Sequence, residues 1–139
     1  MFSKDGKILL KKDGENYSLP GGKPDQRDSS MEDTLKRELD EEVNVSICNI
    51  VMIGYQLVDE QNNIPPYAQV RMAAAITRIG DNRPDPDTGR TYEKILVSPK
   101  QAAELLNWGD VGKQQIQAAV FAAKSIFHLA GFSEPEHSI

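Results

Sequence analysis

Apolar residues recur at every fourth position along one segment of the chain, and this is its clearest pattern. The members of this apolar stripe are Met31, Leu35, Leu39 and Val43. Positions four apart lie on the same side of an α-helix, so the stripe predicts a helix with one buried face. Ser29 and Ser30 precede the stripe, and a serine hydroxyl is a favoured N-cap. Either serine can cap the helix, which we expect to run to about residue 43, and we favour Ser29.

Runs rich in apolar and β-branched residues predict the strands, because turn signals such as Asp-Gly separate them. The expected extended segments are residues 7–11, 17–19, 46–58, 67–79 and 91–97. Gly54 predicts a bend in the first long strand, since glycine inside a strand often marks a bulge. The alanine run 73–75 predicts close packing, or a pocket floor, in the next one.

Two further helices are expected in the second half of the chain. Ser98 and Pro99 predict a helix start, with the serine as cap and the proline in the first turn; this helix should end near Trp108. Apolar positions spaced three or four apart predict a longer helix over residues 111–130, with Gly131 as its stop. Strands interleaved with helices indicate an α/β (α+β) fold with a central mixed sheet covered on both faces.

Length and composition are those of an ordinary globular protein. The chain has 139 residues, of which 39% are hydrophobic and 27% charged, and this favours one domain with a single core. We expect the domain to cover residues 1–131 and a flexible tail to follow at residues 132–139. No apolar run is long enough to span a bilayer, and the start of the chain lacks an apolar signal segment. We therefore expect a cytoplasmic protein without a membrane partner.

Charge and cysteine content narrow the function. The net charge is −5 and no run of Lys or Arg occurs, so we do not expect a nucleic-acid partner. The single Cys48 excludes an internal disulfide and a cysteine-based zinc cage. Two histidines leave little for a histidine-based metal site. Carboxylates are the metal ligands that this composition offers.

Three glutamates gather on one side of the first predicted helix. Glu38, Glu41 and Glu42 are three and four positions apart, so they share a face beside the apolar stripe. Like charges so placed cost roughly 0.2–0.5 kcal/mol per pair in an isolated helix. Hard divalent ions prefer carboxylate oxygens and keep positions for phosphate, so the cluster indicates a Mg²⁺ or Mn²⁺ site. The plainer interpretation is a solvated helix face.

The segment around these glutamates resembles the signature of the Nudix hydrolase family, which includes the MutT-like enzymes. That signature is a glycine, five residues, a glutamate, seven residues, and then R-E-U-x-E-E-x-G-U, where U is aliphatic. The positions that match it are Arg37, Glu38, Leu39, Glu41, Glu42 and Val45. The turn Leu19-Pro20-Gly21-Gly22 is similar to the usual lead-in to the motif. The similarity extends loosely from Gly6 to the long C-terminal helix, hence over most of the chain.

The upstream half of the signature departs from the family pattern. Lys23 stands where the signature glycine should be, so this loop is one residue longer than usual. The upstream glutamate falls on Ser29, with Asp28 and Glu32 as the nearest acids. The late glycine is replaced by Asn44, which also tolerates the left-handed conformation of a helix end.

The first strand of the family is also short here. Only residues 1–3 precede the Asp5-Gly6-Lys7 turn. Either the start is truncated or another chain supplies this edge of the sheet, and the second alternative makes a homodimer a further prediction.

The resemblance implies a Nudix-type α/β/α sandwich and a Mg²⁺ or Mn²⁺ cofactor. It also implies hydrolysis of the diphosphate linkage in a small nucleotide-derived substrate. The implied metal ligands are Glu38, Glu41 and Glu42, with a backbone carbonyl near Gly22. The implied catalytic residues are Glu38, Glu41 and Arg37, of which Arg37 would hold a glutamate by a helical ion pair rather than touch substrate.

Other roles stay open at this point. Glu38 or a carboxylate from a later loop would take the proton of the attacking water, and Glu93 and Glu104 are unranked candidates. Arg71 and Tyr67 are candidates for substrate contacts, although surface solvation is the competing interpretation of the arginine. The alternative functions are a catalytically weak or inactive Nudix domain that binds a nucleotide-like ligand, and a scaffold without a ligand. The fold does not determine the substrate.

Overall fold

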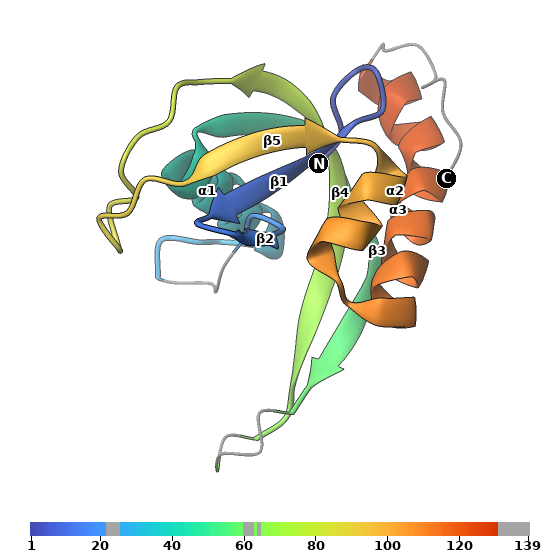
Figure 1. Ribbon diagram of the computed structural model, residues 1–139, viewed down its shortest axis with the longest axis horizontal. Coiled ribbons are helices and arrows are strands. Elements are labelled where there is room, and N and C mark those ends of the chain that lie inside the picture. Colours follow the sequence, from blue (N-terminus) through green and yellow to red (C-terminus); the bar gives the residue numbers. More distant parts are fainter. Residues whose placement is uncertain (22–25, 60–62, 64, 131–139) are drawn as a thin grey trace.

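The computed structural model describes residues 1–21, 26–59, 63 and 65–130. Strands and helices alternate along the chain (Figure 1). In chain order the elements are β1 (Ile8–Asp13), β2 (Asn16–Ser18), α1 (Met31–Val43), β3 (Val45–Val58), β4 (Tyr67–Ile79), β5 (Glu93–Val97), α2 (Pro99–Leu106) and α3 (Gly109–Ala130). The expected tail lies outside the described residues, so its flexibility and the domain limit stay predictions.

The strands pair as two antiparallel groups that a short parallel bridge connects. β1 lies between β2 and β5, while β3 and β4 form a long two-stranded ribbon that extends away from α1 (Figure 1). Phe2 bridges Ile8 in the antiparallel sense and Ala75 in the parallel sense. The predicted mixed sheet is therefore confirmed.

Residues 1–3 occupy the sheet position for which a partner chain was considered. Phe2 donates its backbone N–H to the carbonyl of Ala74 at 2.9 Å and accepts from Ile76 at 2.8 Å. The carbonyl of Met1 accepts from Leu9 at 3.0 Å. The chain thus fills the gap between β1 and β4 itself. A homodimer stays a prediction, without this edge as its reason.

β1 is buried on both faces, and this explains its uninterrupted apolar run. Ile8 and Leu10 belong to the core between the sheet and the helices α2 and α3, whereas Leu9 belongs to the smaller core under α1. Successive side chains of a strand point to opposite faces, so two cores require two apolar sets. The same alternation directs Lys11 toward α1 and Lys12 toward the opposite face.

α1 is positioned by its apolar stripe and by caps at both ends. Leu39 and Val43 are fully buried and contact β3, while Met31 is 46% exposed and lies outside the core, contrary to expectation. The N-cap is Ser30 rather than Ser29, because the Ser30 hydroxyl accepts from the Asp33 N–H at 3.1 Å. The Ser29 hydroxyl turns to the exposed Asp33 carboxylate instead.

The other elements follow the predictions within a few residues. Ser98 caps α2 in a capping box with Pro99 in its first turn, and the register of β3 against β4 shifts next to Gly54. The alanines 73–75 are completely buried, so their role is packing. Within the described part of the chain, no helix combines the length and apolar character needed to cross a membrane.

The position of the cap can be tested with two neighbouring alanine variants. We expect Ser30→Ala to lower the free energy of unfolding by about 1 kcal/mol, the usual value of a lost N-cap. Ser29→Ala should change it by less than about 0.5 kcal/mol, as for an ordinary surface site. Urea denaturation with an unchanged m-value measures both. A larger loss for Ser29→Ala would contradict the assignment.

Candidate functional site

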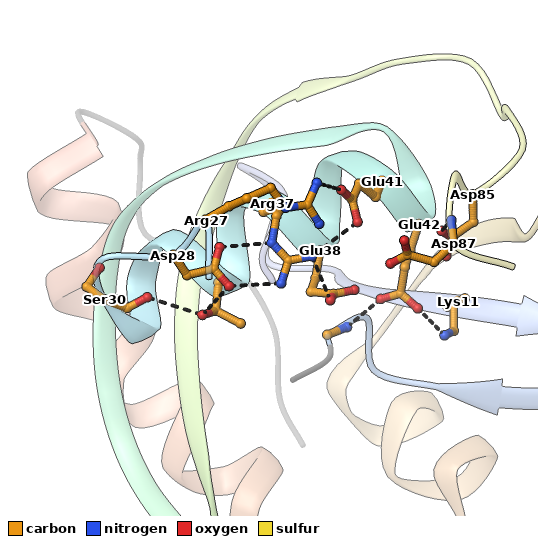
Figure 2. A network of polar contacts seen from close by, with 12 residues as sticks. Lys11, Arg27, Asp28, Ser30, Arg37, Glu38, Glu41, Glu42, Asp85 and Asp87 are labelled. Carbon is orange, nitrogen blue, oxygen red and sulfur yellow. Dashed lines mark hydrogen bonds and ion pairs between the residues drawn. The ribbon is translucent and has the colours of Figure 1, made fainter. Parts of the chain in front are cut away.

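The site is organised around Arg37, whose guanidinium contacts three carboxylates (Figure 2). Its Nη1 lies 3.0 Å from Glu38 Oε1 and 3.2 Å from Glu41 Oε2. The contact with Glu41 spans one helical turn, which is the ion pair that the family resemblance implied. Arg37 is only 13% exposed, so solvent screens these interactions less than at a free surface.

Asp28 is the upstream acid of this site. Its two carboxylate oxygens accept from Nε and Nη2 of Arg37, each at 2.9 Å, and its side chain is 4% exposed. The Thr34 hydroxyl donates to the same carboxylate at 3.0 Å. Asp28 stands one residue before the position of the upstream signature glutamate. Aspartate is shorter than glutamate, but the loop is one residue longer than in the family pattern, and from there Asp28 reaches Arg37. Glu32, the other nearby acid, is exposed.

Glu41 meets a second group of acids from the loop between β4 and β5. One oxygen from each of Glu41, Asp85 and Asp87 lies within 4.8 Å of the others, a spacing at which the three carboxylates could share a metal ion. Asp85 is 5% exposed and accepts from the Asp87 N–H at 2.8 Å. Arg27 also approaches Glu41, at 3.2 Å, from a position that is 59% exposed. The three signature glutamates do not themselves meet this distance condition.

Glu42 points to a different set of partners. Lys11 Nζ lies 2.5 Å from Glu42 Oε2, and both side chains are largely buried. The Gly21 N–H donates to the other oxygen at 2.8 Å. Gly21 has φ = 155°, a value that favours glycine, and this conformation aims its amide at the helix. The Pro-Gly turn thus contributes a backbone donor to the carboxylate.

The environment of Glu38 makes its carboxyl harder to ionise than that of a free glutamate. Burial raises the pKa of the Glu38 carboxyl above its ordinary value, against the opposing effect of the Arg37 charge, and the like charges of Glu42 and Glu41 add to the rise. Among the described contacts, Oε1 accepts from Arg37 and Oε2 has no hydrogen bond. One oxygen of this carboxylate is therefore available for a ligand or a proton.

The structure separates the other predicted residues from this cluster. Arg71 lies with its guanidinium 4.9 Å from the centre of the Trp108 ring, and burial lowers its pKa. Tyr67 begins β4 at the end of the ribbon that extends away from α1 (Figure 1). Glu93 pairs with Lys12 at 3.6 Å, and Glu104 is exposed on α2. Gly22 lies outside the described residues.

The polar site also lies apart from a surface hollow of the described chain. A cavity of about 430 Å³ opens beside Leu9, Asp81 and Lys94, and none of the acids described above lines it. Lys94 binds the carbonyl of Val43, at the C-terminal end of α1, at 2.8 Å. The chemistry of the carboxylates, rather than the depth of this hollow, therefore identifies the site.

Sequence reasoning missed several residues that build the site. The missed groups are Lys11, Gly21 as an amide donor, Arg27, Asp85 and Asp87. Asp28 was noted only as a nearby acid. The loop of residues 81–90 is rich in aspartate, which was the one signal in the sequence that could have pointed to acids outside α1.

The pairing of Asp28 with Arg37 gives a stability test. Asp28→Asn removes the charge from a buried bidentate pair, so we expect the free energy of unfolding to fall by about 3 kcal/mol. Glu32→Gln removes the same charge from an exposed acid in the first turn of α1 and should cost less than about 0.5 kcal/mol. Urea denaturation compares them. Equal losses would mean that Asp28 does not hold the arginine.

Comparison with known proteins places this geometry in a family. The model of the NUDIX domain matches residues 1–118. Among solved structures, MutT from Bacillus halodurans has a TM-score of 0.60 at 21% identity, with 83% of this chain and 74% of that chain covered. A chain from a study of MutT from Aliivibrio salmonicida and Vibrio cholerae has a TM-score of 0.55 at 22% identity, covering 84% and 91%.

A solved structure whose name states its substrate has the same fold. The Ap4A hydrolase of C. elegans has a TM-score of 0.55 at 14% identity, with 86% of each chain covered. None of the curated proteins matches the chain. These identities show a common fold, while the domain match extends over most of the sequence and includes α1 with its glutamates. The chain belongs to the Nudix family, the family of pyrophosphohydrolases that its Arg-Glu-Leu-x-Glu-Glu helix had indicated.

Proposed function

We propose that this protein is a divalent-metal-dependent pyrophosphohydrolase that cleaves the diphosphate linkage of a nucleoside diphosphate derivative. The observation that carries the proposal is the convergence of acids from α1 and from the β4–β5 loop. Glu41 lies between the other two signature glutamates on the helix and meets Asp85 and Asp87 across the site (Figure 2). The cofactor we propose is Mg²⁺ or Mn²⁺, for which such oxygen ligands are suited.

The charge of the site fits a divalent cation. Six carboxylates meet here, and three basic side chains accompany them among the described residues. Among these described side chains, the carboxylates therefore exceed the basic groups by three. The basic groups are Lys11, Arg27 and Arg37. Within the described part of the chain, neither Asp85 nor Asp87 has a cationic partner, although Asp85 is buried. Buried charges are normally paired or bound to metal.

The roles of the side chains follow from their contacts. A bound divalent cation would neutralise the diphosphate and lower the pKa of a water molecule. Arg37 fixes Glu38 through Oε1, so we propose that Glu38 Oε2 takes the proton of the attacking water. Glu41 and Glu42 would hold the metal, and Asp85 would complete the set from the loop. A carbonyl near Gly22 stays a predicted ligand.

Substrate contacts outside the metal site would come from Arg71 and Tyr67. The guanidinium of Arg71 stacks over Trp108, which supports a flat, partly apolar subsite next to a positive charge. We therefore retain Arg71 as a proposed substrate contact. Tyr67 also stays a proposal, although it begins the far end of the ribbon. The substrate is a small nucleotide derivative in this proposal, and a cytoplasmic location is part of it.

One observation favours the alternative of a nucleotide-binding domain with little or no turnover. The signature glutamates all have cationic partners inside the protein, so their mutual repulsion is relieved without a metal. Release of phosphate or nucleotide from dinucleotides, nucleotide sugars or nucleoside triphosphates would distinguish the two functions. If the protein is an enzyme, at least one of these compounds should be cleaved in the presence of a divalent cation. If it is a binding domain, none of them should be cleaved.

Removal of one charge at the centre of the site tests the metal role. We expect Glu41→Gln to weaken Mn²⁺ binding by at least about tenfold, since even outer-shell partners of metal ligands are worth about 10–100-fold. Titration followed by electron paramagnetic resonance of free Mn²⁺ measures the dissociation constant. Glu104→Gln, an exposed acid on α2, is the matched control and should bind as wild type. Equal affinities in both variants would refute the site.

A further inference from the structure

Lys11 is a buried cation in direct contact with one of the signature glutamates. The alternation of side chains along β1 directs it to the face that α1 covers, opposite to Lys12. Its ammonium lies 2.5 Å from Glu42 Oε2, with 16% of the lysine side chain and 7% of the glutamate side chain exposed. Figure 2 shows the pair at the end of the polar network that is nearest to Asp87.

The position of the ammonium is fixed from a second side. Lys11 Nζ lies 4.5 Å from the centre of the Tyr92 ring, which is itself only 7% exposed. The Tyr92 hydroxyl is 3.4 Å from the hydroxyl of Thr88, in the loop that carries Asp85 and Asp87. A cation over an aromatic face is stabilised by the ring quadrupole. Lys11 is thus held between the helix and the acidic loop.

An ammonium ion and a divalent cation compete when they bind the same carboxylate. Both need the negative charge of Glu42, and like charges at ion-contact distance repel strongly where water is partly excluded. The Gly21 N–H occupies the other oxygen of Glu42, so this carboxylate has little capacity for a further cation. Arg37 differs from Lys11 in position, because it belongs to the same helix as Glu38 and Glu41 and contacts them along the surface of that helix.

We propose that Lys11 is an internal counter-cation that competes with the divalent metal for Glu42 and so sets the metal affinity of the site. This inference rests on the proposed function, since it takes Glu42 as a metal ligand. Without metal, the lysine keeps Glu42 neutralised and in place. Metal binding requires the ammonium to leave Glu42 Oε2. The metal therefore binds more weakly than the same acids would allow without the lysine.

The test measures Mn²⁺ binding alone, in the absence of substrate. Lys11→Met keeps an unbranched side chain one heavy atom shorter than lysine and removes its charge, and we expect the dissociation constant for Mn²⁺ to fall by about tenfold. Lys12→Met is the matched control. It changes the net charge equally, but Lys12 pairs with Glu93 at 3.6 Å on the other face of β1. Its dissociation constant should stay within about twofold of wild type.

The sign of the effect separates competition from a structural role. A merely structural lysine would weaken metal binding when replaced, whereas a competing lysine strengthens it. Lys11→Arg restores a cation and should return the affinity toward that of wild type. Affinity in Lys11→Met that equals the Lys12→Met value, or that falls below it, would overturn the proposal. If wild type binds no Mn²⁺, the proposed function fails; if only the Lys11→Met gain is missing, this inference alone fails.

A measurement on wild type covers the case in which Lys11→Met does not fold. Labelling of lysines with acetic anhydride, read by peptide mass spectrometry, reports whether each amine is accessible. Saturating Mn²⁺ should raise the labelling rate of Lys11 severalfold and leave that of Lys12 unchanged, because the metal displaces only the first from its carboxylate. A Lys11 rate that stays constant or falls would overturn the proposal.

Discussion

The bidentate contact between Asp28 and Arg37 is the interaction on which the site depends. It ties the loop before α1 to the polar face of the helix, and the same guanidinium then reaches Glu38 and Glu41. A planar fork with several donors can hold three acids at once in fixed directions, which a lysine cannot do. The apolar stripe of α1 fixes the helix against the sheet. Together these contacts aim the acidic face toward the loop of residues 81–90.

The structure changes the physical argument for a metal. Repulsion among the signature glutamates would call for an external cation if the chain supplied none, yet its described residues supply three. The stronger argument is the surplus of acids, since Asp85 and Asp87 bring negative charge without a cation of their own among the described contacts. Internal cations and a divalent ion are therefore alternative partners of the same carboxylates. Nudix membership supplies the chemistry that these acids would serve.

Local patterns in the sequence were sufficient for most of the fold. The stripe of α1, the Ser98-Pro99 start of α2 and the bend at Gly54 each depend on neighbouring residues, so periodicity and turn chemistry reveal them. The choice between Ser29 and Ser30 failed because the adjacent residues have equal intrinsic merit as caps. The burial of Met31 was predicted wrongly because it is the first residue of α1, where it is 46% exposed and belongs to neither core cluster.

The partners of the glutamates could not be predicted in the same way. Lys11 and Glu42 are 31 positions apart, and only the packing of β1 under α1 brings them together. Asp85 and Asp87 reach Glu41 through an irregular loop whose conformation no periodic pattern encodes. Asp28 lies one residue off the family spacing, so the motif alone missed its role. The helix is thus readable from sequence, whereas the charge balance of the site is a tertiary property.

Anomalous scattering from crystals grown with Mn²⁺ tests the central claim most directly, because it locates the ion without assuming any activity. The account predicts a peak about 2 Å from carboxylate oxygens of Glu41 and Glu42, with the Lys11 ammonium displaced from Glu42. A map without a peak at the acids, in which Lys11, Arg27 and Arg37 keep their ion pairs at saturating Mn²⁺, would contradict it.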